Sequence, residues 1–219
     1  MNKSRQMSET LRLGIILAIS GGFMDAYSYL FRDHVFANAQ TGNMLLLGVN
    51  ISRGNFAEAV RYLFPVIAFT IGIIISDVIR YNTNDKGKLH WRQNSVLFEA
   101  LSLFAVAFIP TEYNLFANSL TSLACGIQVE SFRKIHGSGI ATTMCIGNLR
   151  SGTENLCSFV FYKNKENLGK AMLYYGIILS FIIGAVLGSI AIEFWGEKSI
   201  LVCSFMLALA FLIMFKEKS

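Results

Sequence analysis

The sequence predicts an all-α, polytopic integral membrane protein with about six transmembrane helices, in two inverted-repeat halves that each hold an interrupted, re-entrant segment. The composition indicates a membrane protein: 53% of the 219 residues are apolar and only 15% are charged, with a mean hydropathy of +0.49. A soluble domain carries about 25% charged residues, and a globule of this size has too little interior for so much apolar surface. An ordinary soluble enzyme, a disordered chain and a disulfide scaffold are therefore excluded.

Six apolar stretches reach or approach the length of a membrane-spanning helix, about 17–25 residues. They cover residues 11–31, 62–79, 94–109, 115–132, 171–192 and 199–215. The first follows basic residues and contains Ala18-Ile19-Ser20, which resembles the cleavage site of a signal peptide. Because its apolar character continues to Phe31 and further spans follow, we expect an uncleaved first helix.

Two further segments, residues 35–51 and 138–162, are apolar enough to enter the bilayer but carry glycines and polar residues at their centres. If both cross, the protein has eight spans; if both return to the side they came from, it has six. Lysine and arginine concentrate in cytoplasmic loops. With six spans and the N-terminus inside, all but four of the 19 basic residues are cytoplasmic. With eight spans, eight lie outside and Arg150 lies within a span. The sequence therefore favours six spans, with both termini cytoplasmic.

The two halves, about residues 11–110 and 113–215, repeat a pattern. Gly22-Phe23-Met24-Asp25 precedes Thr41-Gly42-Asn43 in the first half, and Gly126-Ile127-Gln128-Val129-Glu130 precedes Ile146-Gly147-Asn148 in the second. Asp25 and Glu130 each stand 17 residues before the glycine of their Gly-Asn pair. Three spans per half give the halves opposite orientations, and inverted repeats with interrupted segments are typical of a transporter site near the bilayer midplane.

The interrupted segments are the candidate binding site, because irregular backbone at membrane depth is tolerated only inside protein or along an aqueous cavity. Thr41 or Asn43 is expected to cap a helix whose first amides face the site, and Gly42 allows close approach of the backbone. The alternative is that these glycines only let helices pack tightly. The candidate residues are Asp25, Asn38, Gln40, Thr41, Gly42, Asn43, Gln128, Glu130, Thr143, Gly147 and Asn148.

Two of these candidates are acids. Asp25 lies well inside the first span, where acids are costly and face the protein interior or water. Arg150 is the one cation that the sequence places near these acids, and a carboxyl buried without a partner takes up a proton. Asp25 is therefore the candidate coupling group for a proton or cation. Glu130 lies near the end of its span, where simple solvation is an equal alternative.

Other chemistries find no support in the sequence. The four cysteines lie singly in apolar stretches and the three histidines lack ligand spacing, so we expect no metal, cofactor or enzyme activity. The net charge of +5 fits cytoplasmic loops, and no basic stripe with interleaved aromatics indicates nucleic acid.

Several motifs together resemble the YoaK-like bacterial membrane proteins over nearly the whole chain. They are Gly22-Phe23-Met24-Asp25-Ala26, Phe36, Thr41-Gly42-Asn43, Gly126-Ile127-Gln128 and Gly147-Asn148-Leu149. The resemblance implies a multi-pass protein of the bacterial inner membrane and adds no activity.

The leading hypothesis from the residues is a small-solute transporter or channel, coupled to a proton or cation. In it, Asp25, Thr41 and Asn43 face Gln128, Glu130 and Asn148. The expected partners are the lipid bilayer, an unidentified solute, the coupling ion and further copies of the chain. The alternative is a non-transporting membrane scaffold or assembly partner, and a membrane enzyme comes third.

Overall fold

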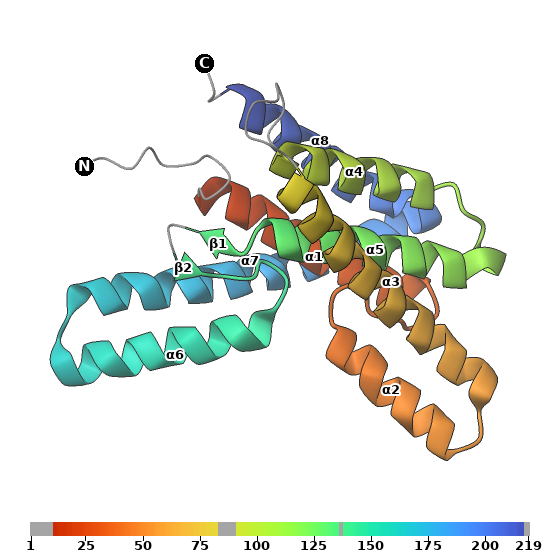
Figure 1. The fold of residues 1–219 in the computed structure, drawn as a ribbon, viewed down its shortest axis with the longest axis horizontal. Helices are drawn as coiled ribbons and strands as arrows, with labels where there is room; N and C mark the ends of the chain where they lie inside the picture. Colours follow the sequence, from red (N-terminus) through yellow and green to blue (C-terminus); the bar gives the residue numbers. More distant parts are fainter. Residues whose placement is uncertain (1–10, 83–90, 136–137, 217–219) are drawn as a thin grey trace.

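The computed structural model describes residues 11–82, 91–135 and 138–216, and this part of the chain is helical apart from loops and one short ladder (Figure 1). The two-residue strands β1 and β2 pair antiparallel, with Lys134 opposite Gly139. In chain order the elements are α1 (Leu11–Phe31), α2 (Gln40–Ser52), α3 (Phe56–Asn82), α4 (Trp91–Val106), the short 3-10 helix η2 (Thr111–Tyr113), α5 (Asn114–Ser131), β1 (Lys134–Ile135), β2 (Ser138–Gly139), α6 (Cys145–Tyr162), α7 (Lys165–Trp195), η3 (Gly196–Ser199) and α8 (Ile200–Lys216).

The predicted apolar stretches all fall on helices. The first coincides with α1, whereas α3 and α7 extend beyond their predicted stretches to 27 and 31 residues. Three stretches of the described helices are long and apolar enough to cross a bilayer: Leu11–Phe31, Phe56–Asn82 and Lys165–Met214, the last of which comprises α7, η3 and most of α8. The prediction of an all-helical membrane protein is therefore confirmed in its main point.

The bundle has a buried apolar core, but its long helices also expose many apolar side chains and bury several polar ones. The apolar residues Ile67, Ile74, Leu179 and Val186 on α3 and α7 are exposed, whereas Glu99 is completely buried. Exposed apolar side chains match the hydrocarbon of a bilayer, and buried polar groups find partners within the bundle. The outer surface is therefore suited to lipid.

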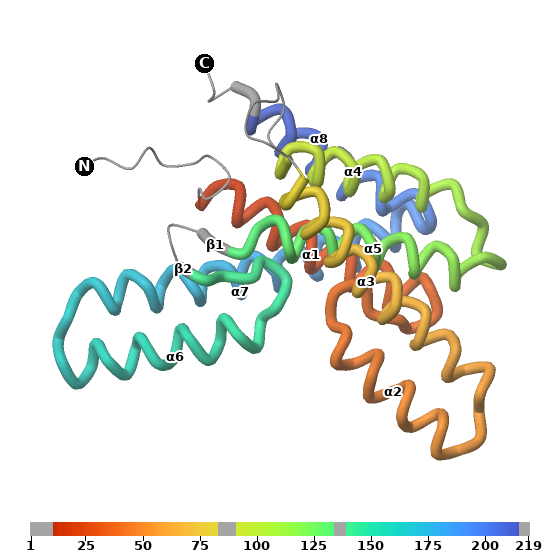
Figure 2. Tube along the Cα trace, in the orientation of Figure 1, coloured from red at the N-terminus to blue at the C-terminus, as the bar shows by residue number. Residues whose placement is uncertain are grey.

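The directions of the helices follow from pairs of contacting residues. Helices α1 and α4 each run antiparallel to both α5 and α8 (Figure 2). Two pairs are parallel: α1 with α7, and α3 with α5. Each direction rests on two contacts. For α1 they are Met24–Cys125 and Leu17–Gln128 with α5, Gly22–Phe181 and Ala26–Gly188 with α7, and Ser20–Cys203 with α8 together with Tyr27–Glu197 in the preceding η3. For α4 they are Ser95–Ser131 and Glu99–Gln128 with α5, and Ala100–Ser204 with α8 together with Ala107, just after α4, and Lys198 of η3; for α3 and α5 they are Phe69–Gly126 and Ser76–Ser131. Going along the chain, α1, α3, α4, α5, α7 and α8 therefore alternate in direction.

Glycines set the two closest helix contacts. A Cβ at Gly22 or Gly184 would overlap the backbone of the facing helix in the α1–α7 pair, and a Cβ at Gly72 or Gly126 would do so in the α3–α5 pair. The facing carbonyl oxygens belong to Phe181, Ile19, Leu123 and Phe69, respectively. Small residues of this kind let helices pack backbone to backbone in membranes.

Two helical hairpins project from this bundle in different directions. One is formed by α2 and the N-terminal part of α3, and the other by α6 and the N-terminal part of α7 (Figure 1). In each hairpin, the shorter helix begins at the bundle and runs outward. Helix α2 buries only Gln40 and Asn43, and α6 buries only Asn148 and Gly152. Helix α2 is therefore anchored to the bundle by its first turn, and α6 by its first turn and by Gly152, which packs against Tyr174 of α7.

Candidate functional site

Two irregular stretches, residues 32–39 before α2 and residues 140–144 before α6, lead the chain into the bundle; we call them the first and second breaks. In the first break, the chain reverses direction at Asp33 and His34. Their φ angles of 64° and 56° lie in the left-handed region, which residues other than glycine rarely adopt. The Tyr29 ring stacks on Phe36 at 4.8 Å and contacts His34 edge-on at 5.1 Å. Aromatic packing thus holds this reversal in place.

An asparagine in the first turn of each short helix closes the break before it. Asn43 Nδ2 donates to the carbonyl of Phe36 at 2.8 Å, and Asn148 Nδ2 donates to the carbonyl of Ala141 at 2.7 Å. Asn43 Oδ1 also accepts the amide of Phe36. Both asparagines are spaced seven residues from their partners, and both hold the local backbone of the break.

The helix starts differ from the expected ones. Helix α2 begins at Gln40 after Ala39, and α6 begins at Cys145 after Met144. Neither residue at the cap position offers the side-chain oxygen that normally binds the first amides. Thr41 and Asn43 lie inside the first turn, so the expectation that one of them caps the helix is wrong.

Asp25, which lies on α1, supplies the hydrogen-bond acceptor that the amides of the first break lack locally. Its Oδ1 accepts the amide of Asn38 at 2.7 Å, and the amides of Ala37 and Ala39 also interact with the carboxylate. It lies within electrostatic range of Cys145 at the start of α6. A carboxylate in this position balances the positive ends of helix dipoles. Asp25 is therefore a tertiary cap for the break.

The two breaks meet at Gly21, in the middle of α1. Asn38 Nδ2 donates to the Gly21 carbonyl at 3.2 Å, and a Cβ at Gly21 would overlap the Thr143 side chain. Asn38 and Thr143 are each 5% exposed. Asn38 Oδ1 and Thr143 Oγ1 have no hydrogen-bond partner among the described residues, although buried polar atoms are nearly always paired. We call this meeting point the polar junction.

Gln128 extends the polar junction towards α4. Its side-chain amide contacts the carboxyl group of Glu99 and lies 3.1 Å from Thr142 Oγ1 in the second break. Glu99 is 0% exposed and forms no ion pair within the described part of the chain. An acid, an amide and a hydroxyl from three segments thus form one buried cluster.

Glu130 is not part of the junction. It forms ion pairs with Arg133 at 3.0 Å and with Arg80 at 3.3 Å, and Arg80 also pairs with Asp77 at 2.8 Å. It therefore has two cationic partners that the sequence analysis did not foresee.

The remaining candidates lie around the breaks. Gln40 Nε2 donates to the Ala37 carbonyl, Gly42 faces the ring of Phe36, and Thr41 and Gly147 are exposed. Of the eleven candidates, Asp25, Asn38, Gln128 and Thr143 surround the polar junction or contact it.

Two buried charged residues are missing from the candidate list derived from the sequence. Glu99 was visible as an acid inside a predicted span, which is itself a functional signal. Arg32 was counted among the residues outside the membrane, but it is 0% exposed. Its guanidinium donates to the carbonyls of Val106 and Pro110, to Asn114 Oδ1 and to the Tyr27 hydroxyl.

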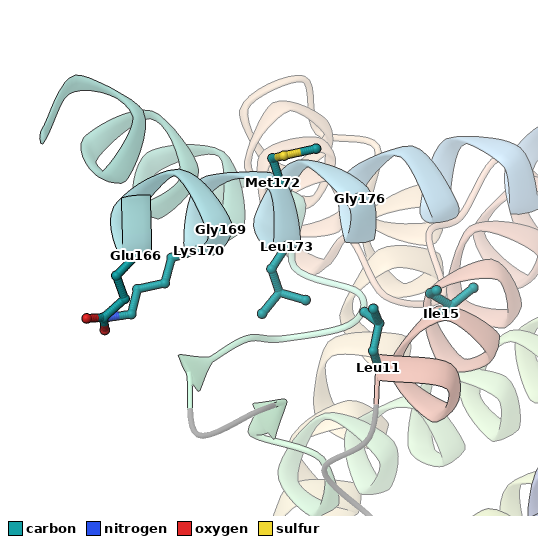
Figure 3. Close-up of a pocket in the computed structure, with 8 residues that line it drawn as sticks. All are labelled: Leu11, Ile15, Glu166, Gly169, Lys170, Met172, Leu173 and Gly176. Carbon is teal, nitrogen blue, oxygen red and sulfur yellow. The ribbon is translucent and has the colours of Figure 1, made fainter. Parts of the chain in front are cut away.

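Two cavities lie towards opposite ends of α1. One, of about 600 Å³, is lined by Leu11 and Ile15 of α1 and by α7 residues, with the Glu166–Lys170 ion pair among its lining (Figure 3). The other, of about 260 Å³, is lined by Asp33, Arg61, Glu112, Asn114 and neighbouring apolar residues. The polar junction lies between them along the helix.

The described residues contain no group of three or more histidine, cysteine, aspartate or glutamate side chains that could hold a metal ion.

Comparisons with known proteins agree on the kind of protein. A family model described as "Protein of unknown function (DUF1275)" matches residues 13–213. The chain is 26% identical over 185 residues to the UPF0700 transmembrane protein YoaK of Bacillus subtilis (strain 168). The aligned region covers 80% of this chain and 81% of that protein. No solved structure matches.

Proposed function

The chain belongs to the DUF1275 family, and from that premise we propose that it is a small-solute transporter or channel of the bacterial inner membrane, coupled to a proton or cation. Membership in a family with a transmembrane relative makes it a membrane protein. The transport activity is our inference from the polar junction, and no catalytic reaction is assigned.

The alternating helix directions support six spans. Helix α1 is antiparallel to α5, and α5 is parallel to α3, so α1 and α3 run in opposite directions. If α2 crossed the bilayer between them, they would run in the same direction. The same reasoning applies to α6 between α5 and α7. We therefore propose that the first and second breaks are re-entrant and that α2 and α6 leave on the side where their breaks entered.

The contacts between helices also support an inverted repeat. The first helix of each half packs on the second long helix of the other, as α1–α7 and α5–α3, and each short helix packs on the helix that follows it. Contact α4–α8 joins the equivalent last helices. Exchanging the halves reproduces the pattern of contacts, as an approximate two-fold axis in the membrane plane requires.

This topology predicts opposite sides for two exposed turns. In a background without native cysteines, Asn55→Cys should react with an impermeant maleimide in intact cells. Lys163→Cys should react only after the membrane is opened. Residue 163 is cytoplasmic with either six or eight spans, so it is the internal reference. Protection of residue 55 in intact cells, with labelling after permeabilisation, would establish eight spans instead.

The observation that carries the transport proposal is the pair of unpartnered atoms at the polar junction, Asn38 Oδ1 and Thr143 Oγ1. They stand at corresponding places, one residue before each cap position, and come from opposite halves. An unmade hydrogen bond of a buried group costs about 1–3 kcal/mol. A small polar solute bound between the breaks would satisfy both atoms. In this proposal the solute would approach the junction from the two ends of α1, where the two cavities lie.

We expect the polar junction to be wet in the transport cycle. Asn38→Cys and Thr143→Cys should therefore react with small impermeant thiol reagents in the purified, reconstituted protein. Retained native Cys203, which is 0% exposed, should stay unreacted and serves as the buried control. A solute found by thermal-shift screening should slow both reactions.

The scaffold alternative makes the opposite prediction. If the substituted cysteines at 38 and 143 are as unreactive as Cys203, the junction is dry and the transport proposal is wrong. Tight glycine-mediated packing would then be the main feature of the protein.

A further inference from the structure

The carboxyl group of Glu99 is buried and has no counter-ion among the described residues. Helix α4 packs on α5 and α8, and the titratable groups that interact electrostatically with Glu99 are the thiols of Cys125 on α5 and Cys203 on α8. Asp25 on α1 acts on the same Cys125 thiol. No lysine, arginine or histidine of the described residues pairs with Glu99. A buried carboxylate in such surroundings is costly, and binding a proton removes that cost.

The Gln128 amide can serve either form of this acid. With its NH2 group towards Glu99, it donates to the carboxylate, 2.9 Å from Oε2, and its oxygen accepts from the Thr142 hydroxyl at 3.1 Å. With its oxygen towards Glu99, it accepts the O–H of the protonated acid. Its NH2 group then donates to the Leu17 carbonyl at 3.3 Å and to Thr142 Oγ1 at 3.1 Å. Each orientation satisfies one protonation state.

We propose that Glu99 binds the coupling proton and that rotation of the Gln128 amide passes its protonation state to the second break. The inference rests on the proposed transport function for its biological role. A proton from water converts the carboxylate into the acid, and its release restores the carboxylate; no other bond changes. Thr142 exchanges the role of donor for that of acceptor when the amide rotates. Its neighbour Thr143 carries one of the two unpartnered atoms of the polar junction.

The two acids of the candidate list, Asp25 and Glu130, have backbone-amide or cationic partners for their ionised forms that Glu99 lacks among the described residues. Asp25 accepts the Asn38 amide at 2.7 Å, which favours its ionised form and holds it to the break it caps. Glu130 has Arg80 and Arg133 beside it. Glu99 differs from both because its described polar neighbour is a neutral amide that accepts either protonation state.

The proton can be detected without any solute. In infrared difference spectra of the reconstituted wild-type protein across a pH titration, we expect a protonated carboxylic acid C=O band that disappears at high pH. Glu99→Gln should lose the band, and Glu99→Asp should retain a titrating band. Gln128→Leu should shift its frequency, because the acid loses its hydrogen-bond partner. A band that titrates identically in wild type and Glu99→Gln would overturn the proposal.

A second measurement tests transmission to the second break. Native Cys145 is half-buried at the start of α6, and it can be kept as the sole cysteine. The ratio of its maleimide labelling rates in wild type and Glu99→Gln cancels the titration of the thiol. This ratio should change several-fold with pH. A ratio that is constant with pH would show that protonation of Glu99 does not reach the break.

These readouts separate the two proposals. A Glu99 band that titrates, together with a dry junction in the cysteine experiment, leaves the proton site standing and removes transport. A wet, solute-protected junction with no Glu99-dependent band keeps transport and removes Glu99 as the coupling residue.

Discussion

Arg32→Ala is expected to lower the free energy of unfolding by about 3–5 kcal/mol, because hydrogen bonds to buried charged groups are strong and truncating one partner leaves the others unsatisfied. The guanidinium connects the end of α1 with the carbonyls of Val106 and Pro110 and with Asn114. Its Nε donates to the Tyr27 hydroxyl, which donates in turn to the Glu197 carbonyl. Loss of Arg32 therefore loosens the ends of four helices at once.

The measurement is thermal unfolding of the purified protein in detergent. Arg53→Ala, which removes an exposed arginine from the end of α2, is the control and should change stability by no more than about 0.5 kcal/mol. Arg32→Lys should recover only part of the loss, since one ammonium cannot reproduce the planar fork of donors. Equal stability of Arg32→Ala and Arg53→Ala would mean that this network contributes nothing to folding.

Gly184→Ala is expected to destabilise the protein by about 3 kcal/mol, because an added Cβ collides with backbone rather than with a movable side chain. The atom that it meets is the Ile19 carbonyl oxygen of α1. Relief requires α7 to move away from α1, which also disturbs Gly22 and the nearby Gly21 of the polar junction. Labelling of Thr143→Cys in the same background should therefore rise along with the loss of stability.

The matched control lies on the same helix. A Cβ at Gly176 meets nothing within 4 Å, so Gly176→Ala should be neutral or should stabilise α7 by up to about 1 kcal/mol through helix propensity. Both variants are compared by thermal unfolding at equal detergent concentration. If Gly184→Ala unfolds at the same temperature as Gly176→Ala, the close α1–α7 contact is not a determinant of the fold.

The helices were predictable because length and apolarity decide them locally. Helix α1 ends at Phe31 as expected, and Pro110 follows the helical part of the third stretch. The starts of α2 and α6 were not predictable, because they depend on acceptors from elsewhere in the fold. Asp25 caps the first break from 13 residues away, and the local sequence around Ala39 does not indicate that this acceptor will be there.

The register of the repeat was also beyond the sequence. The Gly-Asn pairs align Asp25 with Glu130, whereas the glycine contacts with Phe69 and Phe181 make Gly126 correspond to Gly22. The second alignment places Val129 opposite Asp25, because the stretch between helix and Gly-Asn pair is one residue longer in the second half. Spacing alone cannot show where such an insertion falls. The ion pair of Glu130 with Arg80 of α3 depends on how the two helices pack, so the sequence could not predict it.

The cross-pairing of α1 with α7 and of α5 with α3 has a consequence for how this chain can move. The cohesive bodies are not its N-terminal and C-terminal halves but two mixed groups, α1 with α6 and α7, and α5 with α2 and α3. Each group contains helices from both halves of the sequence. A rocking motion that exposes Gly21 to one side and then the other would leave both glycine seams intact and would hinge where α1 meets α5 and where α4 meets α8.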